Sequence, residues 1–180
     1  MELQGWHKLY QELAKKLTDN IPEINWVDLW HNQVGFLVEE HPFPTPALFL
    51  RFRILNTEDL SEHVQRANVQ VDIFYFYETF LDTYQGAYNE ADALTYLETI
   101  SNIHAILHAS SGTHYAEMRR TGFGAVDTGS SGNLYLQSFA CSVVDNSAQI
   151  NYNEATPGDV IVDKGTKPIA NEEPLYIIPN

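Results

Sequence analysis

Apolar residues recur at every third or fourth position near the N-terminus, which is the period of an amphipathic helix. The stripe that this spacing predicts consists of Leu3, Trp6, Tyr10, Leu13 and Leu17. Asn20 and Pro22 mark the end of the helix, because proline removes a backbone donor and disfavours helical backbone before it. The segment 24–30 that follows fits either a short strand or a turn.

The pattern then changes to alternation, which is typical of strands. Residues 41–46 contain three prolines and cannot be helical. Residues 47–54 predict a half-buried strand, with Arg51 and Arg53 on the polar face. Its apolar face comprises Leu48, Leu50, Phe52 and Ile54. Residues 56–68 are polar and predict a connection that could include a helical turn.

The most apolar strand is predicted at residues 69–77. One face carries Val69, Val71, Ile73, Tyr75 and Tyr77. Phe74 and Phe76 lie in the middle of the other face, so the strand is apolar on both sides, as expected of a central strand that is covered from both directions. We expect Val71 and Ile73 to face the helices, while the cover of Phe74 and Phe76 stays open.

A second helix and a hairpin are predicted in the next part of the chain. Asn89 can cap the helix, and Asp92 in its first turn offsets the helix dipole. The apolar stripe comprises Leu97, Ile100, Ile103 and Leu107, and Gly112 lies where such helices stop. The alternating segments 114–126 and 133–144 flank the Gly/Ser-rich residues 127–132, which predicts a β-hairpin.

These elements predict an α/β (α+β) domain over residues 1–145. Its sheet is expected to be mixed and mainly antiparallel, with about four strands and two principal helices. Residues 146–180 are rich in proline and acids and predict an extended arm that adds short strands to exposed edges of its own domain or of a neighbour. The short apolar clusters of this arm are Val160, Ile161 and Val162, and Leu175, Tyr176 and Ile177.

The net charge, the cysteine count and the lack of targeting signals narrow the functions that this chain can have. The 180-residue chain has 24 acidic and 10 basic residues and a net charge of -14, which disfavours binding to duplex DNA or to anionic membranes. The single cysteine, Cys141, excludes an intrachain disulfide. The N-terminus lacks the order of a signal peptide, and no apolar stretch has the ~20 residues of a membrane span, which predicts a cytoplasmic location.

The candidate catalytic chemistry is weak. His104 and His108 lie four residues apart on the second helix and could share a metal ion, with His114 and Glu117 as further ligands. The glutamate of a metalloprotease helix is missing between them, and a structural role at the edge of the core is favoured.

Residues 121–132 are rich in glycine but are followed by a strand rather than a helix, which disfavours a phosphate site. Cys141 in mid-strand predicts an inert core thiol. The sequence therefore predicts no enzyme and no cofactor.

Arg119 and Arg120 are the only adjacent arginines of this acidic chain. They fit two alternatives, either surface ion pairs or anchors for acidic patches of a neighbouring subunit. Tyr84 and Tyr88 lie outside the predicted core and are candidate interface residues as well.

The order of these elements resembles that of the tail terminator, or tail completion, proteins of long-tailed bacteriophages. The resemblance spans roughly residues 3–145 and is carried by HKLYQELAKKL, PFPTPALFLRF, VQVDIFYFYE, ADALTYLETISNIHAIL and LYLQSFACSVVD. The acidic arm departs from the usual short form of the family.

The resemblance implies a small α/β structural protein of the virion neck, assembled in the host cytoplasm as a ring that is usually hexameric. Such a ring caps the tail tube, joins it to the head-tail connector and passes DNA without gripping it. Candidate intersubunit residues are then Arg119, Arg120, Phe74, Phe76, Tyr84, Tyr88 and the two apolar clusters of the arm. The alternatives are a small metal-dependent enzyme that uses His104 and His108, and an interaction module that binds partners through its arm.

Overall fold

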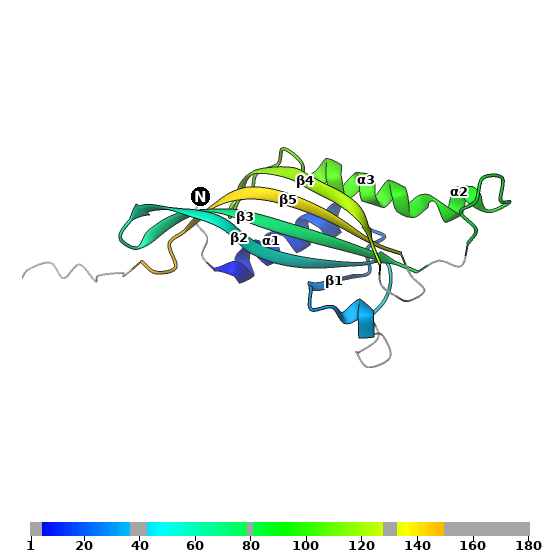
Figure 1. Ribbon diagram of the computed structural model, residues 1–180, viewed down its shortest axis with the longest axis horizontal. Coiled ribbons are helices and arrows are strands. Elements are labelled where there is room, and N and C mark those ends of the chain that lie inside the picture. The colour runs from blue at the N-terminus through cyan, green and yellow to red at the C-terminus, as the bar shows by residue number, and fades with distance from the viewer. Residues whose placement is uncertain (1–4, 37–42, 79–80, 128–132, 150–180) are drawn as a thin grey trace, which may run out of the picture. The chain divides into compact units, whose positions relative to one another are not determined.

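The computed structural model describes residues 5–36, 43–78, 81–127 and 133–149, and within them five strands form one sheet in the order β1-β2-β3-β5-β4 (Figure 1). The pair β1–β2 is parallel and the other pairs are antiparallel. The elements are α1 (Trp6–Asn20), β1 (Trp26–Leu29), a 3-10 turn η1 (Gln33–Phe36), β2 (Ala47–Ser61), β3 (Val64–Tyr77), α2 (Glu90–Ala93), α3 (Thr95–Leu107), β4 (Ala116–Val126) and β5 (Asn133–Asp145). The mixed α+β fold confirms the sequence prediction, and the ambiguous segment 24–30 contains a strand.

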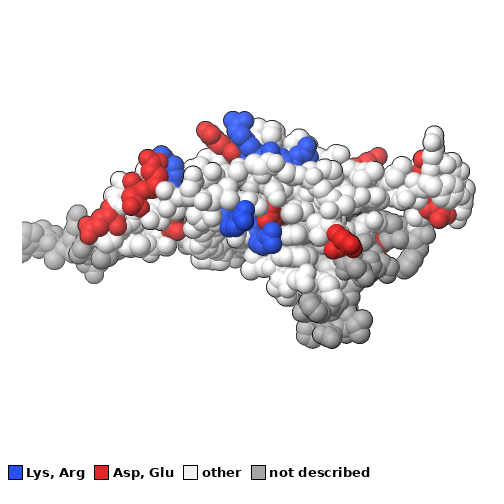
Figure 2. All heavy atoms as spheres, viewed as in Figure 1, with Lys and Arg blue, Asp and Glu red and all other residues white. Residues whose placement is uncertain are grey.

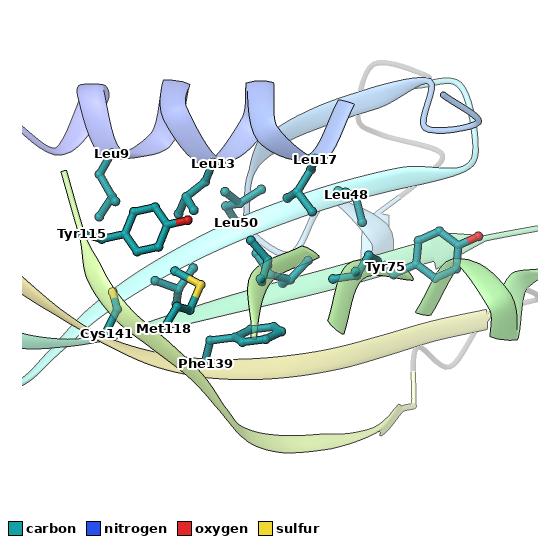
Figure 3. Close-up of a cluster of buried hydrophobic side chains, with 14 of the residues drawn as sticks. Leu9, Leu13, Leu17, Leu48, Leu50, Tyr75, Tyr115, Met118, Phe139 and Cys141 are labelled. Carbon is teal, nitrogen blue, oxygen red and sulfur yellow. The ribbon is translucent and has the colours of Figure 1, made fainter. Parts of the chain in front are cut away.

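The helix α1 packs on the sheet through a stripe rotated from the predicted one. Leu9, Leu13 and Leu17 are buried and point toward the sheet (Figure 3). Trp6 is 36% exposed and Tyr10 is half-buried and packs against the core, so these two lie at the margin of the predicted apolar face rather than at its centre. Both border the core instead, because the Trp6 ring lies 6.1 Å from that of Phe52 and the Tyr10 hydroxyl donates to the Val27 carbonyl at 3.1 Å. The predicted Leu3 lies outside the described residues.

The strand β3 has a hydrophobic cluster on each face, as its sequence predicts. Val71 and Ile73 pack in the cluster that faces α1 and α3, which confirms their predicted orientation. On the opposite face, Phe74 and Phe76 pack with Phe49 in a second cluster. The same chain covers this cluster, since the Trp30 ring stacks on Phe74 with ring centroids 4.0 Å apart and Phe43 meets both Phe49 and Phe76 edge-on.

The predicted connection at 56–68 is wrong. These residues continue β2 and β3 as a long antiparallel hairpin whose pairs run to Ser61 and Val64. Backbone pairing of β2 with β3 and of β3 with β5 holds this part of the hairpin, because nearly all β2 residues after Leu50 are exposed. The face predicted for residues 47–54 is buried at Leu48 and Leu50, whereas Ile54 is 46% exposed.

The predicted second helix is divided into α2 and α3. Asn89 precedes α2 as predicted, but its side chain makes no capping hydrogen bond. Tyr96 is buried, whereas Leu97 is 40% exposed and does not belong to the buried stripe. The helix ends at Leu107, not near Gly112, which lies in the following loop.

Two backbone contacts hold this loop against α1. The amides of Thr113 and His114 donate to the Glu12 carboxylate at 2.6 and 2.9 Å. A side chain at Gly112 would collide with that carboxylate and with the Tyr115 ring, so glycine is required there by the close approach. The predicted hairpin follows this loop and is confirmed, since β4 and β5 pair from Ala116↔Ser142 to Val126↔Leu134.

Candidate assembly surface

In the described part of the chain, the outer edge of β2 is open along most of the strand. The short strand β1 pairs with β2 only from Ala47 to Leu50. Beyond that point, no described strand lies on the outer side of residues 51–61. An unpaired strand edge presents rows of backbone donors and acceptors and is a template for pairing with another chain.

Three large apolar side chains are exposed along this open edge. Ile54, Leu55 and Leu60 are 46%, 46% and 43% exposed. The register with β3 shifts between Ile54 and Asn56 and again between Asp59 and Ser61, so Leu55 and Leu60 occupy irregular positions of the ladder. Such irregularities change the direction of a side chain. At both of these positions the side chain is a leucine that is exposed to solvent.

An apolar groove of about 510 Å³ lies beside the same edge. Its walls come from the start of α1, the end of β1 and the middle of β2, and its lining residues are Trp6, Leu29, Trp30, Leu50, Arg51, Phe52 and Ile54. The groove begins where β1 ends, so an extended segment lying there would continue the sheet past Leu29 and cover apolar rings. We call the open edge 51–61 together with this groove the β2 surface.

The opposite edge of the sheet is closed by comparison. Residues 108–110 lie along the first half of β4, where the Ala109 amide donates to the Met118 carbonyl at 2.7 Å and the Met118 amide to the Ser110 carbonyl at 2.9 Å. The Arg120 amide donates to the His108 ring Nδ1 at 3.1 Å. Two register shifts with β5 also interrupt β4. Pairing with another chain is therefore favoured at β2 and disfavoured over this half of β4.

The two arginines of β4 have different surroundings. The Arg120 guanidinium donates to the Gln137 side chain at 3.3 Å and lies 5.9 Å from the Phe123 ring centroid. Arg119 is exposed. Neither arginine forms an ion pair with an acid in the described parts of the chain, so the ion-pair alternative lacks support there. Their role as intersubunit anchors stays a prediction.

The other candidate interface residues divide into three groups. Tyr84 and Tyr88 are 65% and 96% exposed and are available to a partner. Phe74 and Phe76 are 4% and 0% exposed, and their proposal as intersubunit residues is wrong because Trp30 and Phe43 of the same chain cover them. The arm residues Val160, Ile161, Val162, Leu175, Tyr176 and Ile177 lie outside the described residues.

His104 on α3 and His108 directly after its end form no metal centre with their neighbours in the described part of the chain. The rings of His104 and His108 have centroids 4.8 Å apart. The pKa of His104 is lowered. Partial burial is the largest cause, and the nearby charges of Arg120 and His108 add to it. No group of three His, Cys, Asp or Glu side chains that could hold a metal exists among the described residues, which include His114 and Glu117.

Cys141 is a core thiol, as its position in mid-strand predicts. It is 2% exposed, and burial raises its pKa to about 12, so the thiolate needed for nucleophilic chemistry does not form near neutral pH. Gly122 and Gly124 lie within β4 rather than at the start of a helix, so residues 121–127 of the glycine-rich segment form no phosphate cradle, and residues 128–132 lie outside the described residues.

The sequence prediction missed the β2 surface. The only signal was that Ile54 and Leu55 stand at the end of the predicted strand and that Leu60 lies within the predicted polar connection. No helix in the described part of the chain is long and apolar enough to cross a bilayer. No protein-family model matches the chain, and no curated protein sequence matches it.

Proposed function

We propose that the protein is a structural ring component of a long-tailed bacteriophage, a tail terminator that caps the tail tube and joins it to the head-tail connector. The observation that carries this proposal is the β2 surface. Its open strand edge and its apolar groove are both suited to binding a second chain. The element order that resembles the tail terminator family supplies the identity of the assembly.

The β2 surface favours a contact between copies of this chain. Residues 51–61 offer an edge about as long as β4, and the groove beside them exposes apolar rings that water solvates poorly. If two β2 edges paired with each other, a two-fold dimer would close. A ring requires the β2 surface to meet a different surface of the next copy, so the subunit number separates these two assemblies.

Charge supports a role in which DNA passes without binding. The chain carries a net charge of -14, and like charge repels the phosphate backbone. Acidic side chains gather over the free end of the β2–β3 hairpin, which carries Glu58, Asp59 and Glu62 (Figure 2).

Mutation of the β2 surface tests the proposal. The double variant Ile54→Glu/Leu55→Glu places two charges on the open edge, and the matched control Leu97→Glu changes a leucine of similar exposure on α3. Native mass spectrometry and co-sedimentation with phage tail tubes measure assembly. We expect the wild type and the control to bind tube ends as one closed oligomer, and the double variant to lose about tenfold or more in assembly.

Two outcomes would contradict the proposal. One is assembly of the double variant as strong as that of the control. The other is a wild-type chain that stays monomeric with tubes present. A variant that lacks residues 146–180 distinguishes the interaction-module alternative, which expects partner binding to disappear while the remaining domain stays folded.

A further inference from the structure

A second pocket lies on the helix-covered side of the sheet and shares no lining residue with the β2 surface. Its volume is about 540 Å³, within the range of small-molecule sites. The end of β3, the first turns of α3 and the segment after α1 form its walls. Tyrosines, carboxylates and amides supply much of the lining: Tyr75, Tyr77, Tyr96, Glu23, Glu98 and Asn102.

Tyrosine rings build one wall of this pocket. The rings of Tyr75 and Tyr77 are stacked with centroids 6.4 Å apart, and those of Tyr77 and Tyr96 with centroids 5.8 Å apart. Burial raises the pKa of Tyr75 to about 12. The pKa of Tyr96 is also raised to about 12. The hydrogen bond with Tyr135 is the largest cause, and burial is the next. Both hydroxyls are therefore neutral at neutral pH, and the wall presents uncharged aromatic rings.

Two exposed carboxylates, Glu23 and Glu98, line the pocket beside this wall, and neither has a basic partner among the described residues. Glu23 accepts a hydrogen bond from the Thr99 hydroxyl at 3.3 Å, and Thr99 itself is 5% exposed. The ion pairs of the described residues include neither Glu23 nor Glu98. The pocket thus combines negative charge with aromatic faces, which both attract cations.

We propose that this pocket binds the ammonium or guanidinium group of an organic cation. The carboxylates supply the charge, the Tyr77 and Tyr96 rings supply cation–π contact, and Asn102 offers an amide oxygen as a further acceptor. An anion would be repelled by Glu23 and Glu98, and a neutral apolar ligand would bury their charge without a partner.

Two sources carry this chemistry, a free small cation and a lysine or arginine side chain of a partner protein. The full-length protein is titrated with tetramethylammonium and with methylguanidinium, and the ring resonances of Tyr77 and Tyr96 are followed by NMR. We expect saturable shifts with dissociation constants on the order of millimolar, as for a single charged group in a partly open site. The neutral isostere tert-butanol should give no saturable shift.

Matched variants assign the binding to the pocket. Glu23→Gln/Glu98→Gln should weaken cation binding roughly tenfold through the lost Coulomb attraction, while Glu62→Gln, which neutralises an 89% exposed carboxylate on the hairpin turn, should leave binding unchanged. An unchanged melting temperature of the double variant shows that its fold is intact. Equal shifts with tert-butanol, no saturation with either cation, or full binding by an intact double variant would overturn the proposal.

A third titration assigns the source. A short peptide with a single central arginine is compared with methylguanidinium. Tenfold tighter binding of the peptide supports the proposal with a protein partner as the source, and equal affinity supports it with a small cation as the source. The result does not depend on ring assembly, because the Ile54→Glu/Leu55→Glu variant, which is expected to assemble poorly, can be titrated in the same way.

Discussion

Replacing Asp72 by asparagine tests whether a buried carboxylate joins the strands on the face opposite the helices. Asp72 lies in the middle of β3 and is 1% exposed. Its Oδ2 accepts from Arg51 Nε and Nη2 at 3.1 and 2.8 Å, and its Oδ1 accepts from Gln70 Nε2 at 2.8 Å and Ser138 Oγ at 2.6 Å. Since Arg51 lies on β2 and Ser138 on β5, one side chain connects three neighbouring strands.

The expected cost follows from the loss of one acceptor. Asparagine keeps the shape of Asp72 but replaces one oxygen by an amide that only donates. Either the two Arg51 donors or the Gln70 amide then faces another donor, while the Ser138 hydroxyl can turn to accept. Hydrogen bonds to charged groups contribute about 1.5–3 kcal/mol each. The Arg51 side chain is 49% exposed, so water screens part of its attraction. We therefore expect a loss of about 2–4 kcal/mol, or a drop in Tm of about 5–15 °C for a domain of this size.

Urea denaturation and a thermal melt measure this loss. The control Asp59→Asn changes an exposed carboxylate on β2 that accepts from Gln65 Nε2 at 2.8 Å, and it should stay within about 0.5 kcal/mol of the wild type. An Asp72→Asn protein that unfolds within the same margin as the control would refute the network described above.

Two further predictions concern the core. Cys141 should resist thiol reagents at pH 8 in the native protein and react once the chain is denatured, because the thiol is 2% exposed. Since burial raises the native pKa of Cys141 from 9.0 to about 12, the unfolded chain loses its proton first, and the free energy of unfolding should fall as the pH rises from 9 toward 12. Cys141→Ala should flatten that decline, and an unaltered slope would contradict the assignment. Trp30→Ala should cost about 2–4 kcal/mol in urea denaturation because it uncovers Phe74, whereas Trp30→Phe should cost less than about half of that; equal losses would argue against the stacked cover.

The parts of the fold that could be predicted from the sequence are those whose burial leaves a pattern. The strand β3 is covered on both faces, so Ile73, Phe74, Tyr75 and Phe76 form a continuous apolar run that is typical of a central strand. The hairpin β4–β5 has alternating segments around glycine and serine, which are local signals that depend little on the rest of the fold.

The outer part of the β2–β3 hairpin could not be predicted because residues 56–66 include no buried side chain. Residues 56–66 pair by backbone hydrogen bonds, and exposed strands show no hydrophobic period. The offset of the α1 stripe has a similar cause. Trp6 and Leu9 both fit a helical period, and only the position of the helix against the sheet decides that Leu9 is buried.

The candidate site was predicted only in part for the same physical reason. Exposure of Tyr84 and Tyr88 follows from their polar neighbourhood, and this was predicted correctly. The groove of the β2 surface joins Trp6, Trp30 and Phe52 from three elements, so no local stretch of sequence indicates it.

Electron microscopy of the purified protein mixed with phage tail tubes tests the central proposal most directly. The proposal predicts closed rings of a single subunit number seated on one end of each tube, with the β2 surface of every copy against its neighbour. Bare tube ends beside single chains or two-fold dimers would contradict it.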